Sequence, residues 1–468
     1  EHKHWRISSS DIEAAFLKGE KYDRVLYGRP PRRGPPLPGS VPGSLFRILK
    51  GVFGLNDAPR KWWLRLKQFL LNNGCRQSLV DPALFILEIE RQLRGIIGPH
   101  VDDLLAAGDE AMDQLLEKVD KEFNFGSQEY DSFRHCGIHL RKDKDSGEIF
   151  VGMADYISNM EVTVVPRERR AEPDAHLTAE ECRLLRRLNG ELQWAQSQLR
   201  LDISFGTSTS QGALADPRVR HLVAAGDLVR QLKANRDWEL RFQSLSLSHG
   251  GFVGVSDAGL GNVTRGGATG SLEQGDVHSQ GGHLVLFADD SLSRGGEAGR
   301  FNVLDWRSRR LKRVCRSSFA AETLALADCN DAMQHMRGLL LDIMTPRLRS
   351  EDWEAGVSRW PAMLVTDARD CHDHLQRETM ATPQQRTLLF DLASIRETLD
   401  SGSTTLRWTA TENMLVDAFT KRMDSSHLLN IVSDGMWSVI YDERFVNKEI
   451  AKHRRKQKPR TEPVENGK

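Results

Sequence analysis

The feature that most constrains the fold is a regular alternation of strand-like and helix-like segments in the second half of the chain. Between residues 251 and 436, short apolar runs of strand length alternate with longer runs in which apolar residues recur at helical spacing. Strands are expected near 251–256, 282–288, 302–306, 362–366 and 404–409, and helices at 317–341, at 384–399 and from 412 onward. Such alternation indicates an α/β domain.

The rest of the chain divides at two polar stretches. With 468 residues, two to four domains are expected. Polar sequence near residue 165 and a Ser/Gly stretch near 246 predict domain boundaries, and the Pro- and Gly-rich stretch 29–43 predicts a loop. Helices are expected over 55–72, 109–123 and 178–199, the last with a capping box at Thr178 and Glu181, and strands over 83–88 and 94–107.

Composition excludes several classes of protein. Charged residues make up 28% and hydrophobic residues 39% of the chain, which is ordinary for a globular protein. No apolar run reaches the roughly 18 residues of a membrane span, and no signal peptide is visible, so we expect neither membrane insertion nor secretion. The six cysteines are sparse and lack C-x-x-C spacing, which favours reduced thiols in a cytoplasmic or nuclear protein. A first residue other than Met suggests a piece of a longer chain.

Two adjacent carboxylates, Asp102 and Asp103, stand at the polar tip of the otherwise apolar run 94–107. Neighbouring like charges repel and raise each other's pKa unless a cation neutralises them. Carboxylate oxygens suit Mg²⁺, which also takes substrate phosphates. A third carboxylate, Asp11, is expected at the end of a strand, and the three could hold two ions about 3.5–4 Å apart. The doublet taken alone would better suit a solvated turn.

Four further acidic residues recur at corresponding places of the α/β region. Asp257 and Asp367 each end a predicted strand, Glu322 opens a predicted helix, and Asp417 lies in the last helix. Strand ends and helix starts at one sheet edge are where α/β sites assemble. With no lysine partner expected, four convergent carboxylates call for two divalent ions, which can activate water against a phosphodiester. Taken singly, each acid has a structural explanation as a turn former or a complement to a helix dipole.

Four motifs follow one another in the N-terminal region: DIEAAFLKGE from residue 11, LFRILKGVFGLNDAPRKWW from 45, DPALF from 81 and HVDD from 100. In this order they resemble the reverse transcriptase of copia-type LTR retrotransposons. The resemblance implies that Asp11, Asp102 and Asp103 are polymerase carboxylates, that Phe16 is an aromatic gate against the ribose 2′-OH, and that Arg60 contacts substrate.

The N-terminal region also departs from this family in two places and in one segment. His100 stands where the family has Tyr, and Asn56-Asp57 stands where it has Lys-Gln. Asp57 puts negative charge near the expected nucleotide pocket and should disfavour a triphosphate. The family's fingers segment, which grips the triphosphate, lies upstream of Asp11, so the polymerase half is expected to be incomplete as supplied.

The acidic residues of the second half sit in VSDAGLGN, SSFAAETLAL, VTDARD and TATENMLVDAFTK, which begin at residues 255, 317, 365 and 409. These motifs resemble the ribonuclease H domain of the same elements, and the resemblance makes Asp257, Glu322, Asp367 and Asp417 its catalytic, metal-binding set. The supporting histidines that the family has before Ile395 are replaced by TLLFDLAS. The basic run Trp306–Arg316, with Arg307, Arg309 and Arg310, would contact the phosphates of the hybrid, or else is a charged edge strand.

The resemblance implies a complete architecture. The fold class expected is α/β and α+β: a reverse transcriptase palm and thumb, with a ferredoxin-like palm, followed by a ribonuclease H-like mixed-sheet domain. Residues 1–165 would be palm and thumb, 166–246 a helical connection with a structural role for its Arg-Leu-Asp-Ile-Ser motif, 247–436 the ribonuclease H-like domain, and 437–468 a basic tail.

The function implied is RNA-directed DNA polymerase with ribonuclease H activity, by two-metal phosphoryl transfer with Mg²⁺, or Mn²⁺ in its place. Its partners would be an RNA template, a DNA primer, an RNA–DNA hybrid, deoxynucleoside triphosphates and other products of the polyprotein, in the cytoplasm, within a retroelement particle, or in the nucleus. The ribonuclease H half has the complete acidic set. Two alternatives stay open: a catalytically inactive remnant that at most binds nucleic acid, and a Mg²⁺ nuclease of the same fold with another substrate.

Overall fold

The structure is a computed structural model, and it describes residues 4–29, 41, 43–264, 277–346, 348–379 and 382–446. The chain forms two compact units. Among the described residues, the N-terminal unit consists of 4–142 and 338–353, and the C-terminal unit consists of 143–337 and 354–446. The predicted boundaries at 165 and 246 therefore both fall inside the C-terminal unit. Most of the loop predicted at 29–43, and residues 447–468 of the predicted basic tail, lie outside the described residues.

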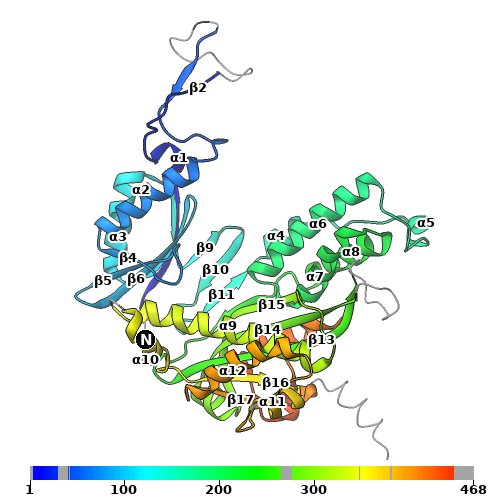
Figure 1. The fold of residues 1–468 in the computed structure, drawn as a ribbon. Helices are drawn as coiled ribbons and strands as arrows, with labels where there is room; N and C mark the ends of the chain where they lie inside the picture. The colour runs from blue at the N-terminus through cyan, green and yellow to red at the C-terminus, as the bar shows by residue number, and fades with distance from the viewer. Residues whose placement is uncertain are drawn as a thin grey trace, which may run out of the picture. The chain divides into compact units, whose positions relative to one another are not determined.

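The N-terminal unit is built on a six-stranded sheet with the order β4-β5-β6-β7-β1-β8, in which every neighbouring pair is antiparallel (Figure 1). Its strands are β1 (Arg6–Ile12), β4 (Cys75–Gln77), β5 (Phe85–Ile89), β6 (Gln92–His100), β7 (Asp103–Gly108) and β8 (Phe125–Tyr130). The smaller elements of the unit are α1 (Ala15–Lys18), the pair β2 (Leu26–Gly28) and β3 (Phe46–Ile48), and the hairpin of β9 (Ser132–His135) and β10 (Ile138–Lys142).

Two amphipathic helices, α2 (Ala58–Asn72) and α3 (Glu110–Phe123), cover this sheet. Their apolar faces form one core with the sheet, in which the indole of Trp62 and the ring of Phe123 meet edge to face at 5.1 Å between centroids. Helix α2 begins three residues later than predicted because Pro59, which lacks a backbone N–H, occupies its first turn. Asp109 caps α3 by accepting a hydrogen bond from the Ala111 amide at 2.9 Å.

The C-terminal unit begins with a strand pair and a group of helices. The pair is β11 (Ile149–Gly152) and β12 (Glu239–Phe242); the helices are α4 (Ala154–Asn159), α5 (Arg167–Arg170), α6 (Ala179–Gln198), α7 (Ser204–Gly212) and α8 (Val219–Ala234). The capping box predicted at Thr178 is confirmed, since its hydroxyl accepts from the Glu181 amide and the Glu181 carboxylate accepts from the Thr178 amide. Leucines of α6 and α8 share one core with the sheet that follows.

That sheet is mixed, with the order β17-β16-β13-β14-β15-β18. Strands β13 (Gly250–Thr264), β14 (Val277–Asp289) and β15 (Gly299–Arg310) form an antiparallel meander, and β18 (Met436–Trp437) pairs antiparallel with β15. Strands β16 (Ala362–Thr366) and β17 (Thr404–Trp408) run parallel to β13. The prediction of an α/β region is confirmed at the level of a mixed α/β fold.

The helices of this region are α9 (Ser318–Met344), α10 (Trp353–Val357), α11 (Arg369–Leu375), α12 (Leu389–Asp400), α13 (Asp417–Thr420) and α14 (Ser426–Asp434). Helix α9 packs closely on β13, where a Cβ added at Gly254 would lie 2.8 Å from Cys329 Sγ. The single helix predicted from 412 onward is wrong: a 3₁₀ turn at Thr411–Asn413 is followed by α13 and α14 as separate helices. No described helix is long and apolar enough to cross a membrane.

Candidate active sites

The first candidate site, called here the hairpin cluster, consists of Asp11, Asp102 and Asp103. Strands β1 and β7 are antiparallel neighbours, and Asp11 lies directly opposite Asp103. Asp102 belongs to the turn between β6 and β7, and its carbonyl accepts a hydrogen bond from the Ile12 amide at 2.9 Å. The fold thus brings together the three acids that the sequence separates by about 90 residues.

The hairpin cluster carries unbalanced negative charge. Burial raises the pKa of the Asp11 carboxyl above its usual value, and repulsion by Asp102, Asp103 and Glu13 raises it further. Next to Asp11, a Cβ added at Gly126 would stand 3.0 Å from Asp11 Oδ2, so a larger residue would crowd this carboxylate. Three hard oxygen donors that repel one another match the ligand set that Mg²⁺ takes.

Phe16 and Arg60 lie on two different helices of the N-terminal unit. Phe16 lies in α1, where its partly buried ring meets the exposed ring of Phe53 with 5.0 Å between centroids. Arg60 lies in the first turn of α2 and is exposed. Neither side chain has a hydrogen bond or ion pair with the hairpin cluster, so their assignment to substrate stays a prediction.

The charge of Asp57 is neutralised within the N-terminal unit. Its carboxylate accepts a hydrogen bond from the Tyr22 hydroxyl at 2.9 Å and forms an ion pair with Arg24 Nη2 at 2.5 Å. The sequence-based argument that Asp57 repels a triphosphate is therefore weakened, because a neighbouring cation balances this carboxylate.

The second candidate site, called here the sheet-edge cluster, gathers Asp257, Glu322 and Asp367. Because β13 and β16 are parallel and pair Val255 with Val365, the two aspartates emerge at the same sheet edge. Glu322 approaches from the second turn of α9. One carboxylate oxygen from each of the three acids lies within 4.8 Å of those of the other two. Asp257 is 2% exposed and Glu322 8% exposed.

Burial and mutual repulsion disfavour the charged forms in the sheet-edge cluster. Burial raises the pKa of Asp257 to about 6, against the opposing attraction of Lys421. Burial also raises the pKa of Glu322 well above its usual value, with repulsion by Asp257 and Asp367 next in size, and it raises the pKa of Asp367, with repulsion by Asp257.

Asp417 joins this site through a lysine. Lys421 Nζ lies 2.7 Å from Asp417 Oδ1 and 3.6 Å from Asp257 Oδ2. Burial opposes the charge of this ammonium, but the attraction of Asp257 and Asp417 outweighs burial and raises the Lys421 pKa. The prediction that the acids have no lysine partner is wrong, and the signal was present in the sequence, because Lys421 lies one helical turn after Asp417. Thr420 donates a further hydrogen bond to Asp257.

The three carboxylates of the sheet-edge cluster suit a divalent cation. Glu322 Oε2 is buried and has no hydrogen-bond partner among the residues that the structure describes. A buried carboxylate oxygen without a partner is costly, and a cation bound by oxygen ligands would satisfy it. The donor set of Asp257, Glu322 and Asp367 therefore suits Mg²⁺ or Mn²⁺.

The predicted phosphate-binding arginines line a groove on the C-terminal unit. Arg307, Arg309 and Arg310 lie along β15 beside an open cavity of about 440 Å³, which polar side chains of α6, α7 and β14 also line. Arg309 forms an ion pair with Asp328, with Nη2 2.5 Å from Oδ1, whereas Arg307 and Arg310 are exposed.

The comparisons with known proteins agree with these motifs. Residues 1–164 match the family model described as reverse transcriptase (RNA-dependent DNA polymerase). The resemblance predicted from the sequence is confirmed: the chain carries a reverse transcriptase region and is similar to Pol polyproteins of retrotransposons.

Its relatives include two retrovirus-related Pol polyproteins of Arabidopsis thaliana. It is 23% identical to the one from transposon RE1 over 92% of this chain and 27% of that protein, and 22% identical to the one from transposon RE2 over 89% and 26%. The Pol polyprotein from transposon TNT 1-94 of Nicotiana tabacum is 20% identical over 89% of this chain and 30% of its own length. The chain thus spans between a quarter and a third of the length of these relatives.

Proposed function

We propose that the chain is an RNA-directed DNA polymerase with ribonuclease H activity, and that each compact unit holds one active site. The observation that carries this proposal is the convergence of the sheet-edge cluster. The three acids, which follow one another in the sequence at separations of 65 and 45 residues, bring one carboxylate oxygen each within 4.8 Å of those of the other two. Two of the three acids are buried. Protein folding does not gather buried like charges unless a cation or a reaction requires them.

In the N-terminal unit, Asp11, Asp102 and Asp103 would hold the metal ions of the polymerase. Support comes from the reverse transcriptase match over residues 1–164 and from the unbalanced charge at Asp11. The substrates would be a deoxynucleoside triphosphate and a DNA primer on an RNA template. A deoxynucleotide carries its own negative charge, so the carboxylates act as anchors for the cations and do not contact the phosphates directly.

In the C-terminal unit, Asp257, Glu322 and Asp367 would hold the ions of a ribonuclease H. When bound, Mg²⁺ or Mn²⁺ lowers the pKa of water and stabilises the charge of the phosphodiester during hydrolysis. Lys421 fixes the carboxylates of Asp257 and Asp417, and Thr420 orients Asp257 by donating a hydrogen bond. The mixed sheet of this region, with parallel strands beside an antiparallel meander, is consistent with the ribonuclease H-like architecture proposed for residues 247–436.

The groove beside β15 would bind the hybrid through its phosphates. Exposed guanidinium groups of Arg307 and Arg310 stand next to amide and hydroxyl side chains, a combination that binds phosphate oxygens. Arg309 already forms an ion pair with Asp328. To contact the hybrid, its guanidinium would have to leave Asp328 and bind a phosphate instead.

The decisive experiment is Mg²⁺-dependent cleavage of an RNA–DNA hybrid by the purified chain, with Asp367→Asn as the inactive control. Asparagine keeps the size of the side chain and removes its charge, so loss of cleavage with an unchanged melting temperature would assign the reaction to this carboxylate. Primer extension on an RNA template, with Asp103→Asn as its control, tests the N-terminal site in the same way.

Two other outcomes lead to the alternatives. Cleavage of duplex DNA as efficiently as of the hybrid would indicate a nuclease of another specificity. If the folded chain neither cleaves nor extends at any Mg²⁺ or Mn²⁺ concentration, it is an inactive remnant, and only its binding of nucleic acid remains to be measured.

A further inference from the structure

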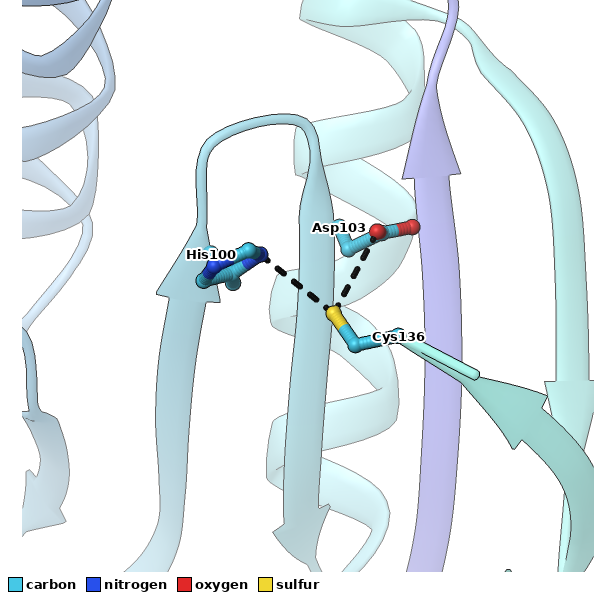
Figure 2. Close-up of side chains that lie close together, drawn as sticks. All are labelled: His100, Asp103 and Cys136. Atoms are coloured by element: carbon cyan, nitrogen blue, oxygen red, sulfur yellow. Dashed lines mark hydrogen bonds between the residues drawn. The ribbon is translucent and has the colours of Figure 1, made fainter. Parts of the chain in front are cut away.

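A mixed group of ligand atoms lies beside the hairpin cluster. The thiol of Cys136 is 3.3 Å from His100 Nδ1 and 3.5 Å from Asp103 Oδ2, and one ligand atom from each of the three residues lies within 4.8 Å of the other two. Figure 2 shows the three side chains directed toward one another from two adjacent hairpin turns. Although His135 and His139 stand close to Cys136 in the sequence, the histidine that meets its thiol is His100, from 36 residues earlier.

The first of these turns joins β6 to β7 and holds two of the ligands. His100 and Asp103 are paired across it, and Val101 between them has a φ of 62°. A β-branched residue at positive φ is strained, and such a position normally takes glycine. The turn is nevertheless held firmly, since the Val101 carbonyl accepts a hydrogen bond from Trp62 Nε1 at 2.6 Å.

The second turn joins β9 to β10 and holds the thiol. His135 pairs with Ile138 across it, and the two central residues, Cys136 and Gly137, have φ values of 48° and 82°. Turns with positive φ at both central positions favour Asn-Gly or Asp-Gly, so Cys136 occupies a place where a cysteine is disfavoured. Backbone strain at both turns, at the residues that bring these side chains together, is typical of a functional site.

We propose that His100, Asp103 and Cys136 form a binding site for Zn²⁺ or a similar transition-metal ion, distinct in its chemistry from the Mg²⁺ sites. Thiolate and imidazole ligands select zinc, whereas Mg²⁺ takes oxygen ligands. With Zn–S near 2.3 Å and Zn–N near 2.1 Å, a tetrahedral site separates sulfur and nitrogen by about 3.5 Å. The distances of 3.3 and 3.5 Å from Cys136 Sγ to its two neighbours already match this separation.

Three protein ligands leave the fourth tetrahedral position open to water or to another group. Because Asp103 belongs to both ligand sets, zinc bound here would take one carboxylate from the hairpin cluster. This inhibitory consequence rests on the proposed polymerase function, but the binding of zinc does not.

The test uses Co²⁺ as a spectroscopic substitute for Zn²⁺, on the full chain after removal of metals and with all thiols reduced. We expect one equivalent of Co²⁺ to give a thiolate-to-cobalt charge-transfer band, which Zn²⁺ then abolishes. Cys136→Ser should remove the band. Loss of an outer-shell partner costs a metal site about 10- to 100-fold in affinity, so His100→Gln, which removes a ligand, should weaken Zn²⁺ binding by more than that. Cys182→Ser alters a partly exposed thiol of the other unit and should behave as wild type. Bound Zn²⁺ should also protect Cys136, identified by mass spectrometry, from alkylation.

Two results would overturn the proposal: a charge-transfer band that survives in Cys136→Ser, or Co²⁺ binding by the wild-type chain without any thiolate band. His100 is exposed and Cys136→Ser is nearly isosteric, so circular dichroism of both variants should be unchanged. Primer extension with Mg²⁺, measured on the same preparation, separates the two hypotheses. A chain that binds cobalt through Cys136 but does not extend a primer retains the zinc site and loses the polymerase assignment.

Discussion

Breaking the buried ion pair between Arg200 and Asp202 should destabilise the C-terminal unit more than any change at its surface. Both side chains are fully buried, and two parallel hydrogen bonds of 2.8 Å join the guanidinium to the carboxylate. A third bond of 3.0 Å links Arg200 Nη1 to the carbonyl of Asn235. Asp202→Asn keeps the volume of the side chain but leaves the guanidinium buried without its countercharge.

The expected loss follows from these contacts. Each hydrogen bond to a charged group contributes about 1.5–3 kcal/mol, and removing one partner of a buried pair costs about 3–5 kcal/mol in total. Replacing both residues together, as Arg200→Met with Asp202→Leu, should cost much less, because no buried charge is then left unpaired.

Chemical unfolding followed by tryptophan fluorescence measures both effects. The matched control is the double variant Arg236→Met and Asp237→Leu, because Arg236 and Asp237 form an exposed ion pair in the same unit. The control should lose less than about 1 kcal/mol. If Asp202→Asn loses no more than the control, or if the double variant at 200 and 202 is as unstable as the single one, the assignment of this pair to the stability of the unit is refuted.

Three further predictions concern pH, packing and salt. Burial lowers the pKa of His221 to about 4, below its value near 6.5 in an unfolded chain. Between these two pH values the unfolded state binds one more proton than the folded state, so the free energy of unfolding falls as the pH falls. It should be about 2 kcal/mol lower at pH 5 than at pH 7, and His221→Gln should reduce that difference. A Cβ at Gly282 would lie 2.6 Å from Phe419 Cβ, so Gly282→Ala should displace α13 and lower hybrid cleavage at least tenfold. Gly190→Ala, at a position in α6 with open space around it, should leave cleavage unchanged. Arg310→Gln should weaken hybrid binding and reduce the slope of log affinity against log salt by about one, as a plot of binding from low to moderate salt would reveal, whereas Arg349→Gln should not change the slope.

Local sequence signals predicted the elements of this fold well. The apolar run with a polar tip became the hairpin of β6 and β7, and Thr178 capped its helix as expected, because short-range spacing and side-chain chemistry decide such features. The sequence also placed Asp257 and Asp367 at strand ends, and the structure shows that these two strands are parallel neighbours.

Contacts between distant segments could not be predicted in this way. Nothing in a strand pattern states that the thiol of Cys136 meets an imidazole from 36 residues away, because two turns with strained backbone and their packing determine that distance. The pairing of Lys421 with Asp257 likewise depends on how α13 packs against β13. Sequence spacing revealed the acids of each site, and tertiary packing determined their counterions.

The direct opposition of Asp11 and Asp103 on neighbouring strands has a consequence for the history of the gene. Like charges facing each other across a strand pair destabilise a sheet. Burial raises the pKa of Asp11, and repulsion by Asp102 and Asp103 raises it further. Asp11→Asn would therefore make the sheet more stable, although the proposed polymerase site would lose one of its carboxylates. In a copy released from selection for catalysis, mutations that neutralise either aspartate would meet no barrier from folding and would accumulate readily. Under the proposed function, intact carboxylates at Asp11 and Asp103 would therefore point to continued selection for catalysis.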